Sequence, residues 1–268
     1  MARHKIIRSP RLARKERRRK IRKIFLLSVL FTAAAAGIVY GLSRPELRII
    51  SIEVAGSRQV QEELIQRTVA NVMKRTYLWF IPKSHTLLYP KTELKESLMK
   101  EFPALSGVSI SLKSLSALRV FVYEREPQAL WCASRQECSM MDKTGFVFAP
   151  AEMGMEQMYY RFLKMDAKAP IGTEVIPQEE LSKLLLFLKK LEMAGLEPRE
   201  VLLKEQDELE VVLSFGTRLL LRSGNYDTAL INLETLMEQD NLLSRNKGEL
   251  SVSYIDLRYG NKIYFKPR

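Results

Sequence analysis

The chain has 268 residues, which is enough for one large domain or two small ones. Its formal net charge of +12 at first suggests a polyanionic partner, but the charge is concentrated at one end. Residues 1–23 carry 12 of the 43 Lys and Arg residues and a single acid, Glu16, which leaves 31 basic and 30 acidic residues in 24–268. The body of the protein is close to neutral, and this excludes a general nucleic-acid footprint there.

The first predicted element is a transmembrane helix over residues 24–42. This stretch, IFLLSVLFTAAAAGIVYGL, has no ionisable side chain except the phenol of Tyr40. At 1.5 Å per residue it makes a helix of about 28 Å, close to the thickness of the hydrocarbon layer of a bilayer. The positive-inside rule places residues 1–23 in the cytoplasm and the rest of the chain on the far side. The alternative is a cleaved signal peptide, although the apolar run exceeds the usual length of about 7–15 residues.

The basic cytoplasmic tail, residues 1–23, is interpreted as a topology signal whose cations rest on anionic lipid headgroups. Binding of DNA or RNA is the alternative on charge alone. The tail has no aromatic residue on which a base could stack, so we expect no nucleic acid among the partners.

The segment after the span is predicted to begin with a strand and a helix. Ile50, Ile52 and Val54 alternate with polar residues, which is typical of a half-buried strand. Residues 61–75 carry apolar side chains at helical spacing, with acids at the start and bases at the end, as the helix dipole favours. The apolar positions of this helix are Leu64, Ile65, Val69, Val72 and Met73.

A second helix and two strands complete this first unit. The aromatic stretch 76–90, broken by two prolines, predicts a partly buried loop with a strand-like piece at 77–81. Thr92 can cap a short helix that ends at Pro103. Alternating apolar residues then predict two strands, Val108–Leu112 and Leu118–Tyr123. The order strand, helix, helix, strand, strand makes a compact unit of about 80 residues with a modest core of its own.

The second half of the chain predicts a larger mixed α/β sheet domain, so the fold class is α+β. Two strands surround an Asp-x-x-Gly turn at Asp142–Gly145, and a helix over 179–194 ends at Gly195 in the C-cap position. The remaining predicted elements are strands at 201–204, 209–215, 218–222, 254–259 and 263–265 and a helix at 227–239.

No motif in the sequence indicates chemistry. The two histidines, His4 and His85, fall on opposite sides of the predicted membrane, so no catalytic dyad can use both. His85 is interpreted as a surface or loop-packing residue. The sequence also lacks a glycine-rich phosphate loop and a metal-binding pattern, so we expect no catalytic site, no cofactor and no metal.

Cys132 and Cys138 are the two cysteines, and both are predicted to lie outside the cytoplasm, where disulfides persist. They flank a polar stretch of five residues between two predicted strands. A disulfide that closes the hairpin is one interpretation, and two free thiols are the other. A redox catalyst would favour the tighter Cys-x-x-Cys spacing.

Several segments together resemble the FtsQ/DivIB family of bacterial cell-division proteins. They are the basic tail with one anchor, the opening IISIEVAGSRQVQEELI, the segment VYEREPQAL, and the ending YIDLRY followed by IYF. The resemblance implies a POTRA domain (polypeptide-transport-associated) over residues 46–126. It also implies an FtsQ-type β domain over 127–268, which ends in a partner-binding edge strand.

The resemblance further implies a non-enzymatic, single-pass scaffold at the septum, in the cell (inner) membrane, that links early and late components of the divisome. Its implied partners are bitopic proteins of the FtsB/DivIC and FtsL kinds and, through them, the septal peptidoglycan synthase. The implied contact includes Tyr259, with Tyr264 and Phe265 as aromatic anchors on the last strand. A free strand edge there could take up a partner strand by β-augmentation. The alternative is that these residues belong to the inward face of a core strand.

Two other function classes stay open. A POTRA-bearing translocation component would be expected to carry several such units or a following β-barrel. A membrane-anchored wall enzyme such as a sortase needs a cysteine with histidine and arginine, and Cys132 and Cys138 lack a partner histidine in a recognisable motif.

Overall fold

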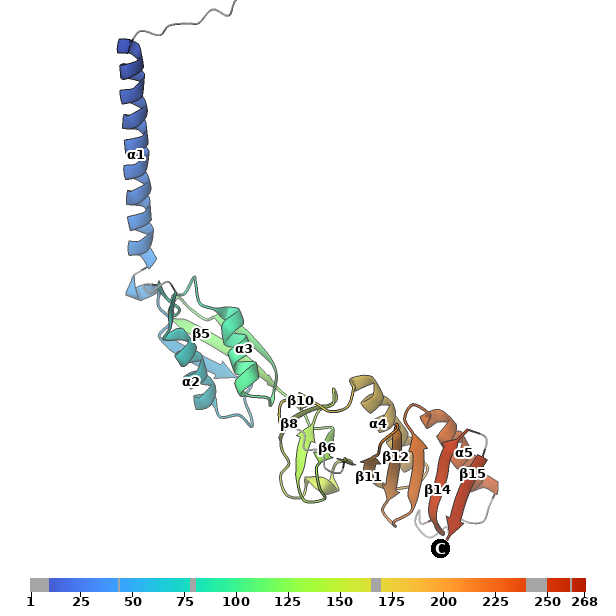
Figure 1. The fold of residues 1–268 in the computed structure, drawn as a ribbon. Coiled ribbons are helices and arrows are strands. Elements are labelled where there is room, and N and C mark those ends of the chain that lie inside the picture. Colours follow the sequence, from blue (N-terminus) through green and yellow to red (C-terminus); the bar gives the residue numbers. More distant parts are fainter. Residues whose placement is uncertain (1–9, 43, 78–80, 165–169, 240–249, 261) are drawn as a thin grey trace, which may run out of the picture. The chain divides into compact units, whose positions relative to one another are not determined.

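The computed structural model of the chain has a mixed α+β fold (Figure 1). It describes residues 10–42, 44–77, 81–164, 170–239, 250–260 and 262–268. Residues 1–9 of the predicted tail and 78–80 of the predicted strand-like piece lie outside this range.

The described chain divides into two compact units. The first unit comprises Met1–Ala55, Glu62–Lys95 and Ser109–Phe121. The second comprises Gly56–Gln61, Glu96–Val108 and Val122–Arg268. This division does not fall at the domain boundary predicted between residues 126 and 127, and that boundary stays a prediction.

The chain begins with one continuous helix, α1 (Pro10–Leu42), which joins basic residues of the tail to residues 24–42 without a break (Figure 1). Lys, Arg and Leu are good helix formers, so the tail extends the helix towards the N-terminus. Among the residues that the structure describes, no helix combines the length and the apolar character needed to cross a membrane. The span predicted over residues 24–42 is therefore not confirmed.

A three-stranded sheet with the strand order β1-β5-β4 follows α1, and β1 runs parallel to β5. The predicted order of strand, helix, helix, strand and strand is present, with a small two-stranded sheet, β2 and β3, between the helices. The elements are η1 (Pro45–Leu47), β1 (Ser51–Ala55), α2 (Glu62–Met73), β2 (Thr76–Tyr77), β3 (Ile81–Pro82), α3 (Lys91–Glu101), β4 (Leu105–Leu112) and β5 (Ala117–Glu124).

Most of the predicted apolar positions of these elements are buried, but three are not. Ile50, Leu64 and Leu112 are exposed, which contradicts the faces predicted for them. Ile50 precedes the first residue of β1, so it lies outside the alternation of that strand, and Ile49 is buried in its place. Leu64 lies in the first turn of α2 and Leu112 is the last residue of β4. Both residues are thus at the ends of their elements, away from the core.

The second sheet has ten strands in the order β10-β8-β7-β6-β9-β11-β12-β13-β14-β15. It is mixed, because β9 runs parallel to both β6 and β11, and β13 runs parallel to β14. The sequence did not predict β9, β10 or η2. The bounds are β6 (Ala129–Cys132), β7 (Cys138–Met141), β8 (Phe146–Pro150), η2 (Met155–Gln157), β9 (Arg161–Leu163), β10 (Thr173–Glu174), β11 (Pro198–Leu203), β12 (Glu208–Leu213), β13 (Arg218–Arg222), β14 (Val252–Tyr259) and β15 (Lys262–Pro267).

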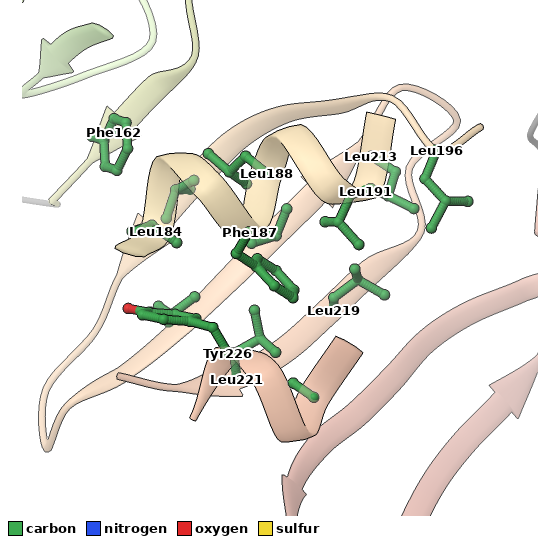
Figure 2. Packing of buried hydrophobic residues seen from close by; sticks show 14 of the residues in the cluster. Phe162, Leu184, Phe187, Leu188, Leu191, Leu196, Leu213, Leu219, Leu221 and Tyr226 are labelled. Atoms are coloured by element: carbon green, nitrogen blue, oxygen red, sulfur yellow. The ribbon is translucent and has the colours of Figure 1, made fainter. Parts of the chain in front are cut away.

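The main core lies between this sheet and the helices α4 (Gln178–Met193) and α5 (Tyr226–Gln239). Figure 2 shows Phe187 of α4 facing Tyr226 of α5, and the ring centroids are 5.6 Å apart. The predicted helix end at Gly195 is present, because Leu196 N–H donates to Leu191 O and Gly195 N–H donates to Glu192 O. This pair of bonds is a Schellman motif, which suits a glycine at positive φ, here +81°.

The packing of the core predicts that replacing two leucines of α4 lowers the free energy of unfolding by different amounts. Leu184 is fully buried and Leu186 is 55% exposed. Leu184→Ala should lower the free energy of unfolding by about 2–5 kcal/mol, because it removes buried methyl groups and leaves a cavity. Leu186→Ala, the matched control on the same helix, should change it by less than about 0.5 kcal/mol. Urea unfolding measures both, and equal losses would contradict the packing described here.

Candidate protein-interaction edge

The last strand, β15, lies at one edge of the ten-stranded sheet. It pairs antiparallel with β14, in a register that sets Ile255 opposite Phe265 and Asp256 opposite Tyr264. Among the strands that the structure describes, β14 is its one neighbour. Such an edge presents backbone N–H and C=O groups that another strand could pair with.

The side chains of β15 alternate between two faces. Ile263 and Phe265 are half-buried and pack against the main core. Tyr264, between them, is 51% exposed. The three residues predicted for partner contact therefore differ in kind, since Tyr259 and Tyr264 reach solvent whereas Phe265 contributes to the core.

Tyr259 and Tyr264 form an aromatic pair beside the edge. Their ring centroids lie 5.6 Å apart and the rings are inclined by 82°, which is an edge-to-face arrangement. Tyr259 is 50% exposed, and the guanidinium of Arg258 lies 5.7 Å from the centre of its ring. The pair places two large amphipathic side chains, each with a hydroxyl group, next to the free strand.

Arg258 anchors this region through two carboxylates. Its Nε and Nη2 donate to Asp256 at 2.9 and 2.6 Å. Its Nη1 donates to both oxygens of Glu208, on β12, at 2.9 and 2.8 Å. Asp256 and Arg258 are two residues apart on β14, whereas Glu208 is 50 residues from Arg258, and the sequence carries no local signal for its part in the network.

This network shifts the ionisation of Asp256. Burial of the carboxyl group acts to raise its pKa, but hydrogen bonds and charge from Arg258 outweigh burial and hold the pKa below its ordinary value. The hydrogen bonds to Asp256 and Glu208 in turn raise the pKa of Arg258, although partial burial opposes this. The ion pair is therefore intact throughout the neutral pH range.

Glu124 and Arg125 belong to the segment VYEREPQAL, and both form hydrogen bonds with backbone groups of other segments in the second unit. The carboxylate of Glu124 accepts the backbone N–H groups of Arg58, Gln59 and Val60 at 2.9 to 3.1 Å. Arg125 donates from Nε to Pro103 O at 3.1 Å. Both residues therefore order backbone rather than form a catalytic site.

Arg125 also holds the predicted turn at Asp142–Gly145. Its guanidinium forms an ion pair with Asp142 and lies 4.0 Å from the centre of the Phe146 ring. The other oxygen of Asp142 accepts Thr144 N–H at 2.8 Å and Phe146 N–H at 3.2 Å. Gly145 has φ +80°, and a Cβ there would lie 1.9 Å from a backbone oxygen, that of Ile176. The turn requires glycine for both reasons.

The remaining residues considered from the sequence do not converge on a site. Cys132 and Cys138 lie opposite each other on β6 and β7 and form a disulfide. His85 is fully buried, and its Nδ1 accepts Leu87 N–H at 3.2 Å. In the described ranges, no group of three or more His, Cys, Asp or Glu side chains could hold a metal ion.

Known proteins resemble this chain most clearly over the residues that form most of the ten-stranded sheet. The family model described as "Cell division protein FtsQ/DivIB, C-terminal" matches residues 129–258. A relative from Dinoroseobacter shibae, named "Cell division protein FtsQ", is 25% identical over 218 residues. The alignment covers 80% of this chain and 64% of that relative. The matched family region ends at Arg258, so Tyr259, Tyr264 and Phe265 lie just beyond it.

The geometry of the turn at Gly145 predicts that alanine is tolerated less well there than at Gly195. Gly145→Ala and Gly195→Ala both place a side chain at a φ near +80°, but no atom lies within 4 Å of a Cβ at Gly195. Gly145→Ala should therefore lower the melting temperature more than Gly195→Ala, because it adds a clash with backbone to the same strain. Thermal unfolding of the two variants measures this, and equal shifts would contradict the geometry of the turn.

The Asp256 carboxylate predicts a pH-dependent contribution to stability. A lowered folded-state pKa stabilises the fold above the ordinary pKa of Asp, and this contribution is lost as the pH falls through the folded-state value. Asp256→Asn should therefore lower the free energy of unfolding at pH 7, and the deficit should shrink below about pH 4. Urea unfolding between pH 7 and pH 3 measures it, with the exposed Asp227→Asn as control. A deficit that is constant with pH would contradict the assigned ion pair.

Proposed function

This chain belongs to the FtsQ/DivIB family of cell-division proteins, and from that premise we propose that it is a membrane-anchored, non-enzymatic scaffold of the division machinery. The scaffold binds bitopic partners of the FtsB/DivIC and FtsL kinds through the edge of its second sheet. Through them it helps control the septal peptidoglycan synthase and links early to late components of the divisome.

Residues 24–42 of α1 support the anchor. The large apolar side chains between residues 24 and 31 are exposed in the structure, so the chain itself does not bury them. They are Ile24, Phe25, Leu26, Leu27, Val29, Leu30 and Phe31. Lipid would cover such a surface, and the 12 Lys and Arg residues of residues 1–23 hold the N-terminus in the cytoplasm. The POTRA and β domains then lie beyond the membrane.

The edge of β15, which pairs with no strand but β14 among the described residues, is the observation that carries the proposal. A strand from a partner can pair with the backbone of β15, and the Tyr259–Tyr264 pair offers an adjoining aromatic surface. Tyrosine is common at the energetic centre of protein interfaces because it buries a large area at small cost in side-chain entropy. The Arg258 network fixes the strand next to which this pair lies.

Only two of the three aromatic residues make a clean test of partner binding. A charge at Phe265 would fall among core side chains and would destabilise the sheet as well as its edge. Tyr264 can be truncated without opening the core, since its side chain points to solvent. Tyr123 of β5, which is 54% exposed, provides a matched control of the same residue type.

Tyr264→Ala is therefore predicted to weaken binding of the FtsB-type partner from the same organism. We expect a loss of affinity of about 5- to 30-fold, the range for an aromatic contact worth about 1–2 kcal/mol. Titration of the detergent-solubilised full chain with its partner measures this. Tyr123→Ala should bind as the unaltered chain does, and equal affinities for all three proteins would contradict the edge proposal.

Localisation separates a scaffold of the division machinery from the other function classes. A fluorescent fusion to the full chain should form a ring at midcell, whereas a translocation component or a wall enzyme need not. The Tyr264→Ala fusion should still be made at normal abundance. A diffuse envelope signal from the unaltered fusion would contradict a role in division.

A further inference from the structure

In the first unit, the segment that follows α1 is hydrogen-bonded to two other segments of the chain. Ile50 N–H donates to Ser116 O at 2.8 Å. The single O–H of Thr86 lies within hydrogen-bond reach of two carbonyl oxygens, Leu47 O at 2.9 Å and Leu115 O. The segments 47–50, 84–88 and 114–116 are thereby tied together outside the strands of the three-stranded sheet.

Each of these segments exposes an apolar side chain. Ile50 is 81% exposed, Leu87 is 71% exposed and Leu115 is 62% exposed. Single exposed apolar residues are ordinary on protein surfaces, whereas several of them on segments that hydrogen bonds hold together make a candidate interaction surface. We call the group formed by Ile50, Leu87 and Leu115 the apolar end of the first unit.

Buried polar residues fix the loop that carries Leu87. His85 and Thr86 are both buried, and Thr86 N–H donates to Leu47 O at 2.9 Å. Leu87 N–H donates to His85 Nδ1 at 3.2 Å, so a side chain beneath the surface orders the backbone above it. The backbone that carries Leu87 is therefore held in place by hydrogen bonds, with the Leu87 side chain exposed.

The position of the apolar end in the chain places it near the membrane. Only seven residues lie between Leu42, the last residue of α1, and Ile50, and the eight steps along the chain can span at most about 29 Å when fully extended. The helix η1 lies within this connection and shortens it. If α1 is the anchor, the apolar end cannot lie far from the bilayer surface.

The residues of this connection suit an interface with lipid. Arg44 lies 4.7 Å from the centre of the Tyr40 ring, and Arg44 and Arg48 are both exposed. One acid, Glu46, lies between them. Arginine binds headgroup phosphates, and tyrosine is enriched at the level of the headgroups. The apolar end thus adjoins residues that are typical of the membrane interface.

We propose that the apolar end is a membrane-docking surface, with the side chains of Ile50, Leu87 and Leu115 inserted into the lipid interface beside α1. The inference rests on the proposed membrane anchor and adds a second contact to it. Such a contact holds the first unit against the bilayer instead of leaving it on a free tether. It needs no backbone pairing, because a lipid surface binds apolar side chains and neighbouring cations directly.

Environment-sensitive probes on single cysteines test the proposal in the full chain. The disulfide occupies both native cysteines, so Leu87→Cys or Leu115→Cys supplies the thiol that is labelled. The labelled chain is reconstituted in vesicles of phosphatidylcholine and phosphatidylglycerol, with and without lipid that carries a quencher near the headgroup. We expect probe emission at both positions to shift to shorter wavelength and to be lost when the quencher is present.

Two further positions make the outcomes distinct. Leu64→Cys, in the first turn of α2, lies about 14 Å along that helix from its C-terminal end. That C-terminal end is the one near the apolar end, since Lys83 N–H donates to Arg75 O and Ile49 N–H to Ser84 O. The Leu64 probe should stay in water. Leu27→Cys, in α1, reports the anchor itself.

Quenching at position 27 without quenching at 87 and 115 would overturn the docking surface and leave the anchor standing. No quenching at position 27 would overturn both. Probes at 87 and 115 that are shielded from an aqueous quencher yet insensitive to the lipid quencher would show that protein, such as a second copy of the chain, covers the apolar end. That result would also overturn the proposal. Far-UV circular dichroism confirms that each labelled variant is folded.

Discussion

The second unit depends on the burial of one face of its ten-stranded sheet beneath α4 and α5. Strand side chains alternate between faces, so this burial decides the place of every other residue in β12, β13 and β14. Val211 and Leu257 face the helices, and Glu210 and Arg258, their neighbours in sequence, must face the other way. Arg258 lies on the face opposite Leu257, and there its guanidinium reaches Asp256 and Glu208.

The same alternation divides stability from binding in the last strand. Phe265 continues the buried face and packs against the core, while Tyr264 points away from it. Adjacent residues in a strand point to opposite faces of the sheet, so these two rings do not lie on one face. Sequence reasoning grouped Tyr264 with Phe265, although the period of two was sufficient to separate them once Ile263 was assigned to the core.

Long periodic elements could be predicted from the sequence, and short or distant features could not. The helices α2, α3, α4 and α5 lie within one or two residues of the predicted bounds, because each has several apolar residues on one face. The strand β9 has three residues and β10 has two, which is too few to show a period. The pair Arg258–Glu208 joins residues 50 positions apart, so only the fold brings them together.

The two proposed surfaces, the edge of β15 and the apolar end of the first unit, suit partners of different chemistry. The edge of β15 presents a row of backbone groups that no other strand in the described part of the chain pairs with, and a partner with its own strand can satisfy them without water. The apolar end carries its side chains on segments outside the strands, so it offers aliphatic surface without such a row. A lipid interface satisfies that surface because it requires apolar area and no register. The two surfaces belong to different units.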